Sequence, residues 1–171
     1  MKQVTTIVIA TFCTLLLSSI GNDLKSLEPT SIQTEPIVEV AEVVVWDSFV
    51  AAVIQVESRG NDNAYCPKED AVGCLQIRPI MVREANRILK SYGVDRRYTL
   101  DDRYSRAKSI EIFSMMAEEV TCCEFLSEDE FFEIVARRWN GGPRGARKKS
   151  TIKYWEKVKV KYYEKQINYN R

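Results

Sequence analysis

Apolar residues recur three or four positions apart in five segments of the chain between residues 46 and 171. This spacing places the apolar side chains on one face of an α-helix, and no segment has the convincing pattern of a strand. The predicted helices cover residues 47–58, 79–91, 105–120, 128–139 and a terminal stretch that starts at Ser150 or Thr151. The sequence therefore predicts an all-α domain over residues 46–171, with irregular loops at 59–78 and 140–149.

Local signals mark the ends of several of these helices. Asp47 can cap the first helix, and Pro79 suits the first turn of the second helix. Ser127 and Glu130 form a capping box before the fourth helix, and the run NGGP at residues 140–143 ends that helix.

The first predicted helix carries a carboxylate on its apolar face. Its stripe of residues spaced four, three and four apart contains Trp46, Val50, Val53 and Glu57. Gly60 ends the helix, so Glu57 lies in the last turn, where the helix dipole disfavours a negative charge. Burial acts in the same direction, and both effects raise the pKa toward the protonated form that a general acid needs. The alternative is a solvated or ion-paired glutamate.

The chain contains no histidine, which excludes several classes of enzyme. Nucleophilic catalysis by Ser-His or Cys-His pairs needs an imidazole, and the common catalytic zinc sites use histidine ligands. The sequence also lacks a glycine-rich phosphate loop of the P-loop or dinucleotide type. Acid–base chemistry must therefore come from Asp, Glu, Lys or Tyr, and we expect no metal and no cofactor.

The N-terminal part of the sequence predicts export from the cytoplasm. Residues 1–22 have one early lysine followed by an apolar run at residues 4–20, which is typical of a signal peptide. An uncleaved membrane anchor is the alternative interpretation. Residues 23–45 carry five Asp or Glu against one Lys, a net charge of −4, and predict an acidic flexible linker. We expect the domain to work in the periplasm, the cell envelope or the extracellular space.

Four cysteines remain outside the predicted signal, an even number that permits disulfides in an exported chain. They are Cys66, Cys74, Cys122 and Cys123. Adjacent Cys122 and Cys123 would be strained if joined to each other, so bridges to Cys66 or Cys74 are more plausible. Buried free thiols are the alternative.

Three short motifs follow one another in a specific order. Glu57-Ser58 ends the first helix, the run GCLQI at residues 73–77 begins 16 residues later, and WNGG at 139–142 ends a later helix. In this order and spacing the chain resembles the SLT-type lytic transglycosylases, which share the goose-type lysozyme fold. That family has a Glu-Ser pair, a Gly-Leu-Met-Gln-like motif and an Ala-Tyr-Asn-Gly-like motif. The resemblance covers about residues 46–160.

The resemblance implies a lysozyme-like domain that cleaves the β-1,4 bond between N-acetylmuramic acid and N-acetylglucosamine in peptidoglycan. Glu57 would be the single acid and base, and the product would carry a 1,6-anhydro ring. Residues expected to support Glu57 or to contact the glycan are Ser58, Gly73, Gln76, Ile77, Trp139, Asn140 and Gly141. The partner is the glycan strand, with membrane association through residues 4–20 and a monomeric state as further expectations.

Departures from the family pattern affect three positions. The tyrosine of the third motif, whose hydroxyl can touch the catalytic glutamate, is Trp139, and an indole N–H donates but cannot accept. A family serine nine residues after that glutamate, which helps with the N-acetyl group of the substrate, is Cys66, and Cys74 occupies the usual leucine position.

Two other functions compete with the transglycosylase. A hydrolase on the same fold would need a second carboxylate to hold a water molecule, and Asp70 is the preferred candidate over Asp62 and Asp102. A wall-binding module without catalysis is the third hypothesis, although a binder has no need of a buried acid.

The C-terminal part of the chain is basic. Residues 137–171 carry twelve Lys or Arg against two Glu, a net charge of +10. The cluster Arg144, Arg147, Lys148 and Lys149 could meet carboxylates of peptide stems or anionic wall polymers. Nucleic acid is not expected as a partner because of the export signal, and a solvated lysine-rich helix is the plainer explanation.

Overall fold

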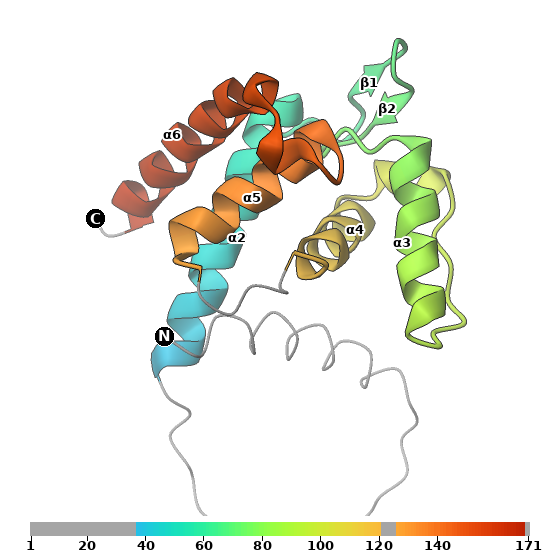
Figure 1. Ribbon diagram of the computed structural model, residues 1–171, viewed down its shortest axis with the longest axis horizontal. Helices are drawn as coiled ribbons and strands as arrows, with labels where there is room; N and C mark the ends of the chain where they lie inside the picture. The colour runs from blue at the N-terminus through green and yellow to red at the C-terminus, as the bar shows by residue number, and fades with distance from the viewer. Residues whose placement is uncertain (1–36, 121–125, 170–171) are drawn as a thin grey trace, which may run out of the picture.

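The computed structural model describes residues 37–120 and 126–169 and is mostly helical (Figure 1). Its helices are α2 (Ile37–Ser58), α3 (Pro79–Ser91), α4 (Arg106–Glu118), α5 (Glu128–Gly141) and α6 (Ile152–Tyr169). Three short 3₁₀ segments are η1 (Asp101–Tyr104), η2 (Gly145–Arg147) and η3 (Lys149–Thr151). Two strands of two residues each, β1 (Tyr65–Cys66) and β2 (Ala71–Val72), form a small antiparallel hairpin. The predicted all-α fold class is confirmed.

Helix α2 packs along α6 and meets α5 through aromatic side chains. Helix α6 packs against both α2 and α5, and α3 packs against α4 (Figure 1). The hairpin follows the end of α2 and leads into α3. This arrangement places the C-terminal end of α2, which carries Glu57, next to the start of α6.

Aromatic side chains from three helices form the centre of the core. Phe49 of α2 is fully buried and stacks on Phe132 of α5, with ring centroids 4.1 Å apart and an interplanar angle of 7°. Tyr162 of α6 meets the ring of Phe132 edge-on at 5.3 Å. Burial of each such ring stabilises the fold by roughly 2–3 kcal/mol, so the apolar stripe of α2 is held firmly in place.

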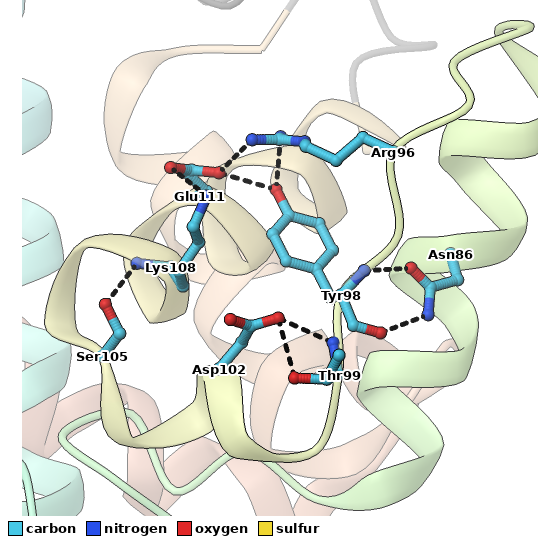
Figure 2. Close-up of polar contacts among 8 residues, drawn as sticks. All are labelled: Asn86, Arg96, Tyr98, Thr99, Asp102, Ser105, Lys108 and Glu111. Carbon is cyan, nitrogen blue, oxygen red and sulfur yellow. Dashed lines mark hydrogen bonds and ion pairs between the residues drawn. The ribbon is translucent and has the colours of Figure 1, made fainter.

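The connector between α3 and α4 is clamped by a polar network (Figure 2). The Asn86 side chain bonds both backbone groups of Tyr98, with Nδ2 2.8 Å from its carbonyl oxygen and Oδ1 2.7 Å from its nitrogen. The buried Tyr98 hydroxyl donates to Glu111 Oε2 at 2.9 Å and accepts from Arg96 at 2.8 Å. The network fixes the segment that leads into η1, and Arg103 of η1 donates to the carbonyl oxygen of Asp70 in the turn between β1 and β2.

The structure differs from the sequence prediction at three elements. Helix α2 begins at Ile37 rather than near 47, so the last nine residues of the predicted linker 23–45 are helical. The segment 37–45 contains no proline or glycine, so nothing in it interrupts a helix. Helix α5 continues to Gly141, two residues past its predicted end. The hairpin was not predicted because strands of two residues leave no readable alternation.

Several expectations concern residues outside the described part of the chain. The predicted signal or anchor at residues 1–22 lies there, as do Cys122 and Cys123. Within residues 37–120 and 126–169, no helix combines the length and apolar character needed to cross a membrane. Cys66 and Cys74 both carry free thiols, so the expected disulfides to these two residues are not present. Burial raises the pKa of the Cys74 thiol, which favours its uncharged form.

Candidate active site

Glu57 lies in the last turn of α2. The helix ends directly after it because Arg59 and Gly60 adopt left-handed backbone angles, with φ of 56° and 84°. Its carboxyl is largely buried, and this desolvation raises its pKa from 4.5 to about 7. At neutral pH the protonated and ionised forms of Glu57 are therefore both populated. A single residue that acts first as acid and then as base needs both forms.

A tyrosine of α6 supplies a hydrogen bond to this carboxyl. The hydroxyl of Tyr154 donates to Glu57 Oε1 at 2.6 Å, and the contact opposes the effect of burial by lowering the pKa of Glu57. Burial and the adjacent carboxylate raise the pKa of the Tyr154 phenol, so the phenol stays protonated and remains a donor. The indole of Trp139 also faces Glu57 and lowers its pKa to a lesser extent.

Sequence reasoning missed this contact with Tyr154. The family tyrosine that touches the catalytic glutamate is a tryptophan at position 139, so a hydroxyl had to come from elsewhere if the site kept one. The absence of a tyrosine at position 139 was the feature of the sequence that could have pointed to a hydroxyl from another residue. In the structure, Tyr154, two positions after the start of α6, supplies a hydroxyl that contacts Glu57.

An ion pair contributes the nearest charges. Arg78 Nη1 lies 3.4 Å from Glu69 Oε2, at the junction between the hairpin and α3. The positive charge of Arg78 lowers the pKa of Glu57, and the negative charge of Glu69 raises it. The two charges act in opposite directions, and burial remains the dominant cause of the raised pKa.

The second motif forms a tight turn after β2. Gly73 has a φ of +82°, and a Cβ at this position would lie 1.9 Å from the carbonyl oxygen of Arg103. Gln76 Nε2 donates to the carbonyl oxygens of Gly73 at 3.0 Å and Ala64 at 3.3 Å. The amide of Gln76 thus holds the turn together. Ile77 has no exposed surface and packs in the core, and its contact with substrate stays a prediction.

The remaining predicted residues lie at two helix ends. Ser58 Oγ bonds the carbonyl oxygen of Ile54 at 3.3 Å, within α2. Trp139 is buried and packs edge-on against Phe113, whereas Asn140 is exposed. Gly141 leaves space for Thr151, because a Cβ at position 141 would lie 2.6 Å from the Thr151 side chain.

The three carboxylates considered for a hydrolase have partners of their own. Asp70 lies 3.6 Å from Arg103 Nη1, with half of its side chain exposed. Asp62 pairs with Arg106 at 3.0 Å, and Asp102 accepts from the backbone nitrogen of Thr99 at 2.7 Å. Among the described residues, the structure gives none of these three carboxylates a direct contact with Glu57.

A hollow of about 90 Å³ adjoins Trp139. Glu57 does not line this hollow, whereas Trp139, which faces Glu57, does. The residues that line the hollow come from α3, α4 and the end of α5, and they are Glu84, Ile88, Phe113, Met116, Ala117, Glu119, Val120, Val135, Arg138, Trp139, Gly142 and Pro143.

Comparison with known proteins agrees with the fold and with the order of the motifs. No curated protein and no solved structure gives a significant match to this chain. The family model described as "Transglycosylase SLT domain" matches residues 39–158, which is more than half of the chain and includes all three motifs. The chain therefore belongs to the transglycosylase SLT domain family, the family of the lytic transglycosylases.

Proposed function

We propose that this protein is a peptidoglycan lytic transglycosylase in which Glu57 is the single acid and base. The observation that carries the proposal is the buried carboxyl of Glu57, with a pKa of about 7 and the Tyr154 hydroxyl 2.6 Å from its Oε1. Membership of the SLT family supports peptidoglycan as the substrate.

The reaction can proceed with one carboxyl group. Protonated Glu57 gives its proton to the glycosidic oxygen, and the bond from that oxygen to the anomeric carbon of N-acetylmuramic acid breaks. The N-acetyl oxygen of the same sugar stabilises the positive charge that develops. Ionised Glu57 then accepts the proton of the 6-hydroxyl, whose oxygen bonds to the anomeric carbon. The 1,6-anhydro ring closes, and Glu57 is protonated again for the next cycle.

The donors of Tyr154 and Trp139 and the burial of Glu57 favour opposite protonation states, one for each stage of this cycle. The two donors stabilise the ionised carboxylate that forms after the first proton transfer, while burial stabilises the protonated form before it. These opposing effects keep the pKa of Glu57 near neutrality, where proton transfer in both directions is efficient.

Mass spectrometry of digested peptidoglycan tests the proposal. The wild-type protein should release muropeptides with 1,6-anhydro ends, and Glu57→Gln should abolish release while it still binds the polymer. Reducing ends would indicate the hydrolase with Asp70, and absence of release by the wild type would indicate a wall-binding module.

Glu118→Gln is the matched control for this experiment. Burial and the nearby Glu119 also raise the pKa of Glu118 to about 7, and its Oε1 is buried without a hydrogen-bond partner. If Glu118→Gln retains activity while Glu57→Gln loses it, a raised pKa alone does not explain the loss.

We also propose that the protein acts outside the cytoplasm and contacts a membrane through residues 4–20. The apolar run in that segment and the location of peptidoglycan support this proposal. Cell fractionation of the full chain, compared with a chain lacking residues 1–22, provides the test. Equal amounts of both chains in the cytoplasmic fraction would contradict it.

A further inference from the structure

The loop between α5 and α6 begins and ends at the candidate acid. Trp139, near the end of α5, and Tyr154, near the start of α6, both face the carboxyl of Glu57. The intervening residues 140–153 are therefore anchored beside Glu57 at both ends. The side chains that the loop exposes belong to a segment whose two ends contact the candidate acid.

Hydrogen bonds and close packing fix this loop to α5. The Thr151 hydroxyl lies 2.8 Å from the carbonyl oxygen of Gly145 and 3.1 Å from Nε of Arg137. A Cβ at Gly145 would lie 1.9 Å from the carbonyl oxygen of Arg137, so the loop backbone rests directly on the helix. Lys148 Nζ donates to the carbonyl oxygen of Gly141 at 2.6 Å. The backbone that carries the exposed residues is thus pre-organised.

The loop presents unpaired positive charge. Residues 134–155 contain seven Lys or Arg and no Asp or Glu. Four of these cations are exposed and form no ion pair with any residue in the described part of the chain, namely Arg144, Arg147, Lys149 and Lys153. Unpaired cations on a fixed backbone favour an anionic ligand, because little ordering is needed when the ligand binds.

We propose that this cationic loop binds the carboxylates of the peptide stem carried by N-acetylmuramic acid. The inference rests on the proposed function. The stem is attached to the same sugar whose anomeric carbon would react, and residues 140–153 are anchored beside the acid at both ends, so a bound stem would lie close to this loop. The cation that lowers the pKa of Glu57 is Arg78, which lies outside the loop. The loop cations therefore act on the substrate rather than on the acid.

Steady-state kinetics on two forms of one polymer test this inference. Intact peptidoglycan is compared with the same material after an amidase has removed the peptide stems, leaving bare glycan strands. The triple variant Arg144→Gln, Arg147→Gln, Lys149→Gln should lower kcat/KM on intact peptidoglycan about fivefold, consistent with the loss of three exposed ion pairs. On bare strands it should change kcat/KM less than twofold. The products should still carry anhydro ends.

A second triple variant provides the matched control. Lys90→Gln, Arg97→Gln, Lys165→Gln removes the same charge from exposed positions at the ends of α3 and α6 and in the connector. It should leave both rates unchanged, and neither variant should shift the pH profile, which reports Glu57. A wild type that releases no anhydro products would contradict the proposed function instead.

Three outcomes would overturn the stem assignment. One is an equal loss of rate on both substrates, and another is no loss on either. The third is a preference for intact material that disappears when hydrofluoric acid removes phosphate polymers and leaves the stems in place. That result would identify phosphate as the anion that the loop binds.

Discussion

The hydroxyl of Tyr154 lies 2.6 Å from Oε1 of Glu57, although 97 positions separate the two residues in the chain. The contact joins the end of α2 to the start of α6, the two helices that carry the acid and its hydroxyl partner. The site therefore depends on how α6 docks on α2, and its chemistry can be tested through the partner as well as through the acid.

Replacement of Tyr154 by Phe should slow the reaction and shift its pH dependence. The hydroxyl stabilises the ionised form of Glu57, so its loss should raise the pKa of Glu57 further. If proton donation limits kcat/KM, the rate falls as pH rises through this pKa, and the fall should move to higher pH in Tyr154→Phe. Loss of one hydrogen bond to a charged group corresponds to roughly a tenfold decrease in kcat. A pH–rate profile on soluble glycan fragments measures both effects.

Tyr162→Phe is the control on the same helix. The Tyr162 hydroxyl also binds a carboxylate, Glu128 Oε1 at 2.7 Å, but Glu128 is not among the groups that shift the pKa of Glu57. This variant should keep the wild-type profile. An identical shift in both variants would mean that the effect comes from α6 as a whole.

The raised pKa of Glu57 should make the folded protein less stable as pH increases. Because its pKa is about 7 when folded and 4.5 in the reference state, the folded chain binds more protons between these values. Stability therefore falls as pH rises from about 4.5 to 7, and the full penalty is present above pH 7. Glu57→Gln removes this penalty and should stabilise the protein by roughly 1–3 kcal/mol at pH 8, with little effect at pH 4.

Thermal unfolding of wild type and Glu57→Gln at the two pH values measures this difference. Comparison at each pH cancels the contribution of Glu118, whose pKa is raised in the same direction. A stability difference of the same size at pH 4 and pH 8 would show that Glu57 does not titrate across this range.

The Asn86 clamp should contribute measurably to stability (Figure 2). Asn86→Ala removes two hydrogen bonds to the backbone of Tyr98 and leaves that backbone without its partners. We expect a loss of about 2 kcal/mol in urea-induced unfolding. Asn63→Ala is the control, because the Asn63 side chain is exposed and forms no hydrogen bond with a described residue; it should change stability by less than about 0.5 kcal/mol.

The sequence predicted the helices well because apolar periodicity directly reports which face of a helix is buried. Val50 and Val53 are buried on the same stripe as Glu57, and α3 spans the predicted residues 79–91. The capping box of Ser127 and Glu130 opens α5 as predicted. These features depend on neighbours along the chain, so local patterns were sufficient.

Contacts made by the polar ends of side chains were harder to predict. Tyr154 has an apolar ring at a packing position and a hydroxyl that reaches Glu57, and periodicity reports only the ring. Gln76 was expected in the cleft, but its amide bonds the turn that its own positive φ of 49° helps to form. Ile77 is the last residue of the second motif, and its side chain packs in the core. Such roles depend on tertiary contacts that no local pattern encodes.

Replacement of Gly73 by Ala should distort the turn that packs against η1. The new Cβ would lie 1.9 Å from the carbonyl oxygen of Arg103, which is backbone and cannot simply rotate away, and the φ of +82° adds strain. We expect a loss of more than about 3 kcal/mol in urea-induced unfolding, together with lower activity. Gly93→Ala separates the two causes, because Gly93 has a similar φ of +72° and open space around its Cβ position. It should lose only the roughly 1–2 kcal/mol of backbone strain and keep full activity, and equal losses in both variants would mean that the contact with Arg103 is unimportant.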